Sequence, residues 1–465
     1  MEIKGKELSK IGYTNHVARS LAVGIINKHC KHAVKEDITT ILTDLLLTPD
    51  KYKDSPVWSK LAEHFLPIVK DKHFDVYQLS DDPVAYKTYG GKFIDNLAKQ
   101  QMNLAMRLPV ALAGALMPDA HAGYGLPIGG VFAVENAVIP YAVGLDIGCR
   151  MSLSVFDIKA DYLKRYAYHI KEALKEYTHF GMDGGLSFEQ EHEILDRSEF
   201  QLTPLLKMLH GKVVRQLGTS GGGNHFVEFG EISLRENNIL NLPEGNYLAL
   251  LSHSGSRGLG AAIAQQYSQI ARDVCRLPRE AQHFAWLNLD TEAGQEYWMS
   301  MNLAGDFAKA CHERIHVNLS KALGLKALAN VNNHHNFAWR EEIYPGKYAI
   351  VHRKGATPAG KGVPGFIPGS MATEGYLVCG KGVGESLNSA SHGAGRAMSR
   401  QKAKEQFTNS ALKKLLTQKG VTLIGGSVEE MPLAYKDIDR IMPAQDALVE
   451  IHGRFMPRIV RMNKE

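Results

Sequence analysis

A carboxylate and a thiol stand three residues apart in a glycine-flanked turn of this sequence. Residues 144–150 read GLDIGCR, so Asp146 and Cys149 share one short loop after an apolar run. A hard oxygen and a soft sulfur together suit a borderline divalent ion such as Mn²⁺, Zn²⁺, Fe²⁺ or Co²⁺ better than Mg²⁺ or Ca²⁺. The pair is equally compatible with a buried structural cysteine and an aspartate that caps a turn, so it does not establish a metal site by itself.

Four further loops carry histidines among glycine, serine and asparagine residues. They contain His225 (GGGNH), His253 (SHSGSR), the neighbours His334 and His335 (NNHHN), and His392 (SHGAGR). A single loop histidine commonly faces solvent without a function. Several of them beside an Asp/Cys pair favour a multinuclear metal centre, in which a thiolate bridges two ions and neutral imidazoles complete the coordination.

Basic residues lie beside the same glycine-rich turns. They are Arg257, Arg353, Lys354, Arg396 and Arg400. Guanidinium groups and free backbone amides together hold phosphates, although each of these side chains is also compatible with a solvated surface charge. A phosphorylated substrate is therefore expected.

The elements that must position these loops are a mixture of strands and helices. Short apolar runs predict buried strands at residues 110–117, 131–134, 138–143 and 151–156. Helical periodicity predicts helices at residues 161–177, 259–275 and 298–323. The expected fold class is α/β (α+β), with glycine-rich loops that allow close approach to ligands.

The first ninety or so residues have a different, helical texture. Apolar residues recur at helical spacing over residues 37–47, with Asp37 as the expected N-cap and Pro49 just beyond the end. The turn-rich sequence SDDP at residues 80–83 marks a candidate boundary. We therefore expect a helical N-terminal extension or subdomain over residues 1–90 and a catalytic domain over residues 91–465.

Length and composition are those of a folded protein. The 465 residues, 44% hydrophobic and 22% charged, exclude a disordered, collagenous or coiled-coil chain. The net charge of +5 is compatible with a polyanionic ligand and far from that of a polybasic tail. The apolar runs are shorter than the roughly 18 residues of a membrane span, so a cytoplasmic protein without membrane association is expected. The five scattered cysteines argue against a disulfide framework.

Seven ordered motifs together resemble the RtcB family of RNA-splicing ligases. They are MPDAHAGYGLPIG at 117–129, VGLDIGC at 143–149, GGGNHFVE at 221–228, SHSGSR at 252–257, HN at 335–336, HRKGAT at 352–357 and HGAGR at 392–396. A weaker match, AYKDID, follows at 434–439. The resemblance implies an RtcB-like fold in which central β-sheets surround a dinuclear metal pocket.

The resemblance also implies an activity, that of a GTP-dependent RNA ligase in RNA splicing, tRNA processing or RNA repair. Members of this family join an RNA end carrying a 2′,3′-cyclic phosphate or 3′-phosphate to a 5′-hydroxyl end, using GTP and Mn²⁺, here two ions per chain. RNA with those ends is the expected partner, and an archease-type protein is a candidate activator. His392 would be the nucleophile that takes GMP from GTP, which suits an unprotonated imidazole.

Individual roles follow from the same resemblance. Cys149 would bridge two ions, one completed by His253 and His335 and the other by Asp146 and His225. The residues expected around GTP are Asn224, Phe226, Val227, Glu228, Asn336, Pro368, Gly369, Ser370, Met371, Gly393, Ala394, Gly395 and Lys464. Arg257 and Arg400 would hold an RNA phosphate.

The chain departs from the family's pattern in three respects, the first being that its helical stretch before about residue 90 is not matched to the family's best-known members. The loop at 368–375 reads PGSMATEG, so a glycine stands where the family carries a hydroxyl that touches the nucleotide. The chain ends NKE instead of KG, and Lys464 is the candidate counterpart of the family's terminal lysine. Two other functions stay open: a dinuclear metal-dependent phosphoesterase, which uses water and does not need His392, and a non-catalytic RNA-binding descendant.

Overall fold

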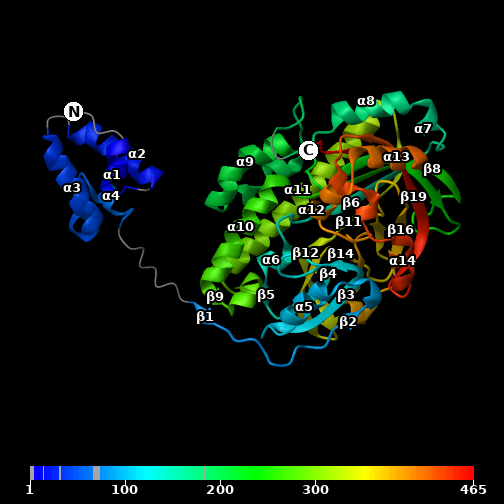
Figure 1. Ribbon diagram of the computed structural model, residues 1–465, viewed down its shortest axis with the longest axis horizontal. Coiled ribbons are helices and arrows are strands. Elements are labelled where there is room, and N and C mark those ends of the chain that lie inside the picture. The colour runs from blue at the N-terminus through cyan, green and yellow to red at the C-terminus, as the bar shows by residue number, and fades with distance from the viewer. Residues whose placement is uncertain (1–4, 14, 31–32, 66–73, 182–183, 465) are drawn as a thin grey trace. The chain divides into compact units, whose positions relative to one another are not determined.

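The computed structural model describes the chain except for residues 1–4, 14, 31–32, 66–73, 182–183 and 465. The chain divides into two compact units, Met1–His73 and Phe74–Glu465 (Figure 1). This division comes before the expected boundary at residue 90, because segments of 74–90 pair with strands of the larger unit. β1 (Asp75–Val76) pairs with β9 (Cys275–Arg276), and β2 (Lys87–Thr88) pairs with β3 (Ala111–His121).

The first described elements are helices, and the larger unit contains both helices and strands. The α-helices are α1 (Gly5–Ile11), α2 (His16–His29), α3 (Lys35–Leu47), α4 (Ser59–Ala62), α5 (Asn96–Ala105), α6 (Pro140–Val143), α7 (Tyr162–Arg165), α8 (Ala167–Tyr177), α9 (Pro204–Gln216), α10 (Arg257–Val274), α11 (Glu292–Leu323), α12 (Arg400–Gln406), α13 (Asn409–Lys419) and α14 (Ile438–Ile441). The remaining strands are β4 (Ile128–Val134), β5 (Ala137–Val138), β6 (Arg150–Phe156), β7 (Phe226–Leu234), β8 (Gly245–Ser254), β10 (Leu287–Asn288), β11 (Ala327–His334), β12 (Asn336–Tyr344), β13 (Lys347–Lys354), β14 (Ala356–Pro358), β15 (Pro364–Ile367), β16 (Gly375–Gly380), β17 (Ser389–Ser391), β18 (Thr422–Ile424) and β19 (Val449–Met462). The mixed α/β class is confirmed.

The N-terminal unit has a hydrophobic core of its own. The helix expected over residues 37–47 is α3, which begins two residues earlier and places Asp37 in its first turn. Ile38, Leu42 and Leu45 face inward from α3 and pack with buried residues of the neighbouring helices. Residues of this cluster all come from the first 65 positions, so the unit is held together by its own apolar contacts.

The larger unit is built on two sheets. An eight-stranded sheet has the order β11-β6-β8-β7-β19-β16-β15, with β18 beside β19, and a five-stranded sheet has the order β12-β13-β4-β3-β2. The central strand β8 is buried on both faces because successive side chains point to opposite sides. Leu248 and Leu250 join one hydrophobic cluster, whereas Ala249 and Leu251 join another. The continuous apolar run that results is typical of a central strand.

The helices α8 and α11 cover one face of the eight-stranded sheet. Leu174 of α8 and Leu319 of α11 pack in the same cluster as Phe229 of β7. Thr291 caps the start of α11 by accepting a hydrogen bond from the backbone N–H of Gly294, and Gly324 ends the helix in the left-handed region. The long helix therefore forms a rigid support behind the strands that carry the site.

Two sequence predictions need correction. The apolar run at 138–143 was expected to be one strand, but only its first residue belongs to β5, and α6 follows because Pro140 occupies the first helical position. The helix expected over 161–177 is divided into α7 and α8, which are separated at Tyr166.

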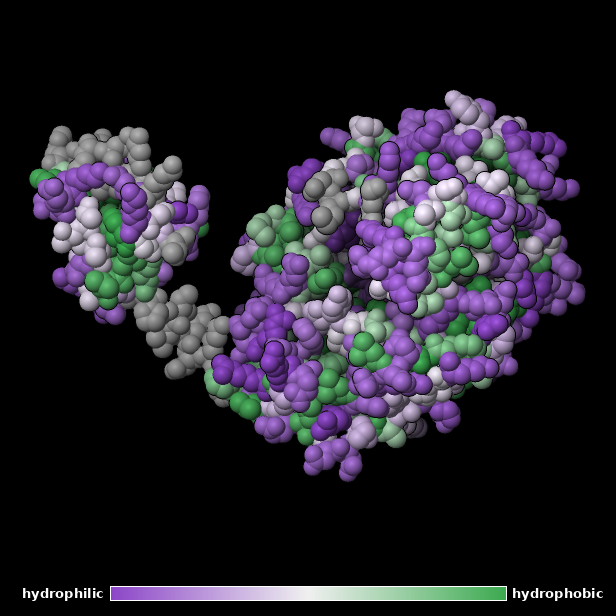
Figure 2. Space-filling view, in the orientation of Figure 1, coloured by the Kyte–Doolittle hydropathy of each residue, from purple (hydrophilic) through white to green (hydrophobic). Residues whose placement is uncertain are grey.

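The space-filling view shows hydrophilic residues interspersed with hydrophobic ones over the visible face of the larger unit (Figure 2). Among the described residues, no helix combines the length and the apolar character that crossing a membrane requires.

Candidate active site

The predicted metal ligands lie where neighbouring strands of the eight-stranded sheet end. Cys149 directly precedes β6, His225 directly precedes β7, and His253 lies near the end of β8. Because β8 pairs with both β6 and β7, His253 is opposite Met151 on one side and Phe226 on the other. The antiparallel register therefore brings three loops that are distant in the sequence together at the same end of these strands.

Backbone hydrogen bonds hold the fourth ligand loop against the first. The N–H of His335 donates to the carbonyl of Cys149 at 2.9 Å, and the N–H of Gly148 donates to the carbonyl of Asn336 at 2.8 Å. His335 follows β11, which pairs with β6. The turn between β11 and β12 is thus fixed beside the Asp/Cys loop.

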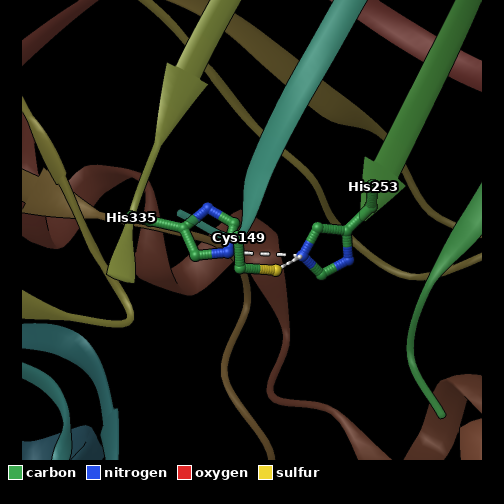
Figure 3. A group of neighbouring side chains, drawn as sticks. All are labelled: Cys149, His253 and His335. Atoms are coloured by element: carbon green, nitrogen blue, oxygen red, sulfur yellow. Dashed lines mark hydrogen bonds between the residues drawn. The ribbon is translucent and has the colours of Figure 1, made fainter. Parts of the chain in front are cut away.

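Cys149 lies between two groups of candidate ligands. Its Sγ is 3.4 Å from Nε2 of His225 and 3.2 Å from Nε2 of His253. Figure 3 shows His253 and His335 pointing toward one another beside the thiol, with their Nε2 atoms 3.3 Å apart. On the other side, Oδ2 of Asp146 is 2.9 Å from Nε2 of His225. Each triad, Cys149–His253–His335 and Asp146–Cys149–His225, brings its ligand atoms within 4.8 Å of one another.

Gly221 and Gly255 provide the space that two of the ligand side chains occupy. A Cβ at Gly255 would lie 1.9 Å from Oδ1 of Asp146, and a Cβ at Gly221 would lie 2.2 Å from Nδ1 of His225. Any other residue at these positions would displace a ligand side chain. The glycine-rich loops therefore serve the close packing of ligands against backbone.

Burial sets the protonation states of the donors. It lowers the pKa of His253 to about 3 and that of His335 well below its usual range, so both imidazoles are neutral and free to bind a cation. Burial, together with the carboxylate of Asp146, raises the pKa of the Cys149 thiol. Burial alone would also raise the pKa of Asp146, but the adjacent His225 brings it down to about 2. Imidazole nitrogens, a cysteine sulfur and a carboxylate in this arrangement fit a borderline divalent ion.

His392 lies next to these triads and is held by a buried aspartate. Its ring is 5.0 Å from that of His335, between centroids. Nδ1 of His392 is 2.7 Å from Oδ2 of Asp119, which also accepts a hydrogen bond from the backbone N–H of His392 at 3.2 Å. Asp119 was not among the predicted site residues, although it belongs to the MPDAH motif. Because Asp119 engages Nδ1, Nε2 is the ring nitrogen that remains for chemistry.

Lys436 supports the same pair from the C-terminal part of the chain. Its Nζ donates to the carbonyls of Asp119 and Ala120 at 3.0 and 2.6 Å. Burial alone would raise the pKa of Asp119, which is 0% exposed, but the hydrogen bond from His392 and the charges of His392 and Lys436 lower it. The carboxylate is therefore ionised and accepts a hydrogen bond from the Nδ1–H of His392.

A cavity of about 320 Å³ joins the two triads to His392. Most of the predicted site residues line it: Asp146, Cys149, Asn224, His225, Phe226, Glu228, His253, His335, Asn336, Pro368, Gly369, Ser370, Met371, His392, Gly393, Ala394, Gly395 and Arg400. Thr373 also lines it, and its hydroxyl lies 2.9 Å from that of Ser370. The loop at 368–375, in which a glycine replaces the expected hydroxyl, thus contributes the hydroxyl of Thr373 instead.

Three predicted residues do not line this cavity. Val227 packs into the core behind β7, because side chains alternate along the strand between Phe226 and Glu228. Lys464 is exposed. Arg257 is partly buried, and its guanidinium donates to the hydroxyl of Thr219 at 3.0 Å and to the backbone carbonyl of Gly181.

The basic residues of the glycine-rich turns fall into two groups. Arg396 and Arg400 line the cavity and share one buried carboxylate, Glu430, at 3.3 and 3.7 Å. Arg353 instead forms a bidentate pair with Glu341 at 2.7 and 2.8 Å within the fold. Glu430 was missed by sequence reasoning because no local motif marks it. Because two guanidinium groups share one carboxylate, this side of the cavity is positively charged.

The chain matches known proteins along most of its length. The family model described as tRNA-splicing ligase RtcB matches residues 100–207 and 188–463. The RNA-splicing ligase RtcB of Escherichia coli (strain K12) is 31% identical over 408 residues, which cover 82% of this chain and 97% of the relative. The tRNA-splicing ligases RtcB of Nanoarchaeum equitans and Aeropyrum pernix are 31% and 32% identical, over 78% of this chain and 91% and 90% of the relatives.

Proposed function

The chain belongs to the RtcB family, and from this membership we propose that it is a GTP-dependent RNA ligase. It joins an RNA 3′-phosphate, or a 2′,3′-cyclic phosphate after its opening, to a 5′-hydroxyl end. The observation that carries the proposal is the pairing of His392 with Asp119 beside the two ligand triads. A hydrolase that uses water has no need of a histidine oriented in this way.

The first step is attack by Nε2 of His392 on the α-phosphorus of GTP. A nitrogen–phosphorus bond forms, the bond to the β-phosphate oxygen breaks, and pyrophosphate leaves. Asp119 accepts a hydrogen bond from the Nδ1–H of His392, which keeps the proton on Nδ1, leaves the Nε2 lone pair available and stabilises the positive charge that develops on the ring. The small residues Gly393, Ala394 and Gly395, which line the cavity, leave room for the nucleotide.

The next two steps transfer and then release GMP. An oxygen of the RNA 3′-phosphate attacks the guanylate phosphorus, and His392 leaves as a neutral imidazole. The 5′-hydroxyl of the second RNA then attacks the activated 3′-phosphorus, so that the phosphodiester forms and GMP departs. Arg396 and Arg400 lie on the cavity wall where the charges of these phosphates need compensation.

Asp146, Cys149, His225, His253 and His335 would hold two divalent ions, for which Mn²⁺ suits the mixed donor set better than Mg²⁺. Such ions neutralise phosphate charge and polarise the phosphorus centre. The chain's own contribution is to keep the imidazoles neutral by burial and to present the thiol of Cys149 to both positions. Glu228, whose pKa is raised by burial, adds a carboxyl group to the cavity lining.

The test is incubation of the protein with [α-³²P]GTP and Mn²⁺, followed by denaturing gel electrophoresis. The wild type should carry a label that acid removes and alkali does not, as expected of a phosphoramidate. His392→Ala should lose both the label and RNA joining while it retains bound metal. His334→Ala is the matched control, because His334 neighbours a candidate ligand but stacks on Trp339 outside the triads.

Three outcomes separate the functions that the sequence left open. A labelled wild type that joins RNA supports the ligase. A wild type that hydrolyses RNA phosphates without ever carrying a label supports the phosphoesterase. RNA binding without label or turnover supports the non-catalytic descendant.

A further inference from the structure

One large aromatic side chain is exposed in an otherwise well-anchored loop. Tyr124 is 78% exposed, at the tip of the glycine-rich segment 122–127 that connects β3 to β4. The N–H of Gly123 donates to Oε1 of Gln101 at 3.1 Å, and the N–H of Ala122 donates to Oδ2 of Asp95 at 3.2 Å. The backbone of the loop is thus fixed while the ring of Tyr124 contacts solvent.

A second aromatic group lies directly beneath this loop. The rings of Tyr141 and His283 are stacked with centroids 4.8 Å apart and an interplanar angle of 19°. A Cβ at Gly125 would lie 3.1 Å from Cδ1 of Tyr141, so the loop rests on that ring. His283 belongs to a 3₁₀ turn, Arg279–Phe284, and is exposed.

A buried cation ties the two aromatic groups together. Nζ of Lys354 donates to the backbone carbonyls of Tyr124 and Tyr141 and lies 5.4 Å from the centre of the Tyr141 ring. Burial lowers the pKa of Lys354 to about 8, which leaves most of it charged at neutral pH. The aromatic groups are therefore adjacent to positive charge, which favours a polyanionic partner over an uncharged apolar one.

The same loop borders the active-site cavity. His121 and Ile128, on either side of residues 122–127, both line it. Gly355, which follows Lys354, lines it as well, and a Cβ there would lie 3.1 Å from Cε1 of His392. An RNA strand whose terminal phosphate reaches His392 must leave the cavity along one of its edges. The edge formed by residues 122–127 carries aromatic rings.

We propose that Tyr124, together with the Tyr141/His283 pair, is a stacking platform for nucleobases of the RNA strand whose end enters the cavity. This inference rests on the proposed ligase function and adds to it a binding surface outside the cavity. Stacking on an aromatic ring accepts any base, because every base has a π-face. The platform thus holds RNA ends of different sequence in the same position.

The test compares Tyr124→Ala and Tyr124→Phe with Tyr168→Ala in the full-length protein. Tyr168 is a matched control because it is 67% exposed on α8, and no cavity-lining residue belongs to that helix. The affinity for a fluorescent single-stranded RNA with a 3′-phosphate is measured by anisotropy. Tyr124→Ala should bind about tenfold more weakly, whereas Tyr124→Phe and Tyr168→Ala should bind like the wild type. Melting curves establish that the variants are folded.

Abasic RNAs identify the contact. Removing the base that stacks on Tyr124 should weaken binding to the wild type but not weaken binding to Tyr124→Ala any further, since the partner is already gone. Equal RNA affinity of Tyr124→Ala and the wild type would overturn the platform, as would a loss that is the same for intact and abasic RNA at every position. A defect of Tyr124→Ala seen only with an added protein would also overturn it, in favour of a protein-docking role.

The guanylylation assay on the wild type keeps this outcome distinct from failure of the ligase proposal. A wild type that is labelled by GTP and joins RNA, with a Tyr124→Ala variant of unchanged RNA affinity, refutes only the platform. A wild type that is never labelled refutes the ligase proposal itself.

Discussion

Asp119 and His392 are 273 positions apart in the sequence, and their side chains meet through a 2.7 Å hydrogen bond between Oδ2 and Nδ1. The same carboxylate oxygen accepts the backbone N–H of His392. The contact fixes both the position of the imidazole and the nitrogen that carries its proton. It therefore makes the reactivity of His392 depend on a residue of a different sheet.

Asp119→Asn should reduce guanylylation by about 100-fold or more. An amide can donate its own proton to Nδ1, which moves the ring proton to Nε2 and removes the lone pair needed for attack. The measurement is the rate of labelling by [α-³²P]GTP under saturating Mn²⁺. Asp161→Asn, at an exposed surface ion pair, is the control and should label normally. A normal rate in Asp119→Asn would contradict the orienting role.

The same aspartate should make stability depend on pH in the acid range. The pKa of Asp119 is lower in the folded protein than in the unfolded chain, where it is about 3.9. The stabilisation that its carboxylate provides is therefore fully present above the unfolded pKa and is lost as the pH falls through the folded pKa. The difference in free energy of unfolding between the wild type and Asp119→Asn should thus be constant from pH 7 to 5 and shrink below about pH 4. Urea denaturation in the presence of a chelator measures it. A difference that grows on acidification would contradict the assignment.

Cys149→Ala should lower the affinity for Mn²⁺ at both triads, because Cys149 is the donor that they share. We expect the metal affinity to fall by more than the roughly 10- to 100-fold that follows when a hydrogen-bond partner of a ligand is removed. Titration calorimetry and metal analysis report it. Cys311→Ala is the matched control: Cys311 is also a buried free thiol, but it belongs to neither triad. If Cys149→Ala keeps both binding events, the shared-ligand arrangement is wrong.

Arg400→Ala and Arg257→Ala should fail in different ways. Arg400 is about half exposed and lines the cavity, so its loss should slow RNA joining by about tenfold or more with little change in melting temperature. Arg257 is partly buried, and its guanidinium joins Thr219 to the adjacent loop. Its loss should therefore lower the melting temperature as well. Joining assays beside thermal melts distinguish the two, and an Arg400→Ala variant that joins 3′-phosphate RNA normally would exclude Arg400 from phosphate binding.

Deleting residues 1–73 should leave a folded protein that still labels with GTP. The apolar cluster of the N-terminal unit contains only residues of that unit, and every cavity-lining residue lies in the larger one. The truncated chain should melt cooperatively and carry the His392 label at the wild-type rate. Loss of labelling with the fold intact would show that the first unit contributes to the reaction.

The sequence alone determined the kinds and the order of the ligands. Asp146, Cys149 and the loop histidines are recognisable because each stands in a short motif whose residue types already restrict its chemistry. The strands β4 and β6 and the helices α10 and α11 are predictable for a similar reason, since burial on one face or on both leaves a periodic apolar pattern.

Only the tertiary structure decided which side chains meet. The partnership of Asp119 with His392, and that of Glu430 with Arg396 and Arg400, joins segments that are distant in the sequence and meet only in the folded chain. Local sequence patterns predict neither partnership. The same holds for Val227, which strand alternation turns into the core between two cavity-lining neighbours. Motifs specify the chemical groups of this protein, and the long-range packing of its two sheets specifies their geometry.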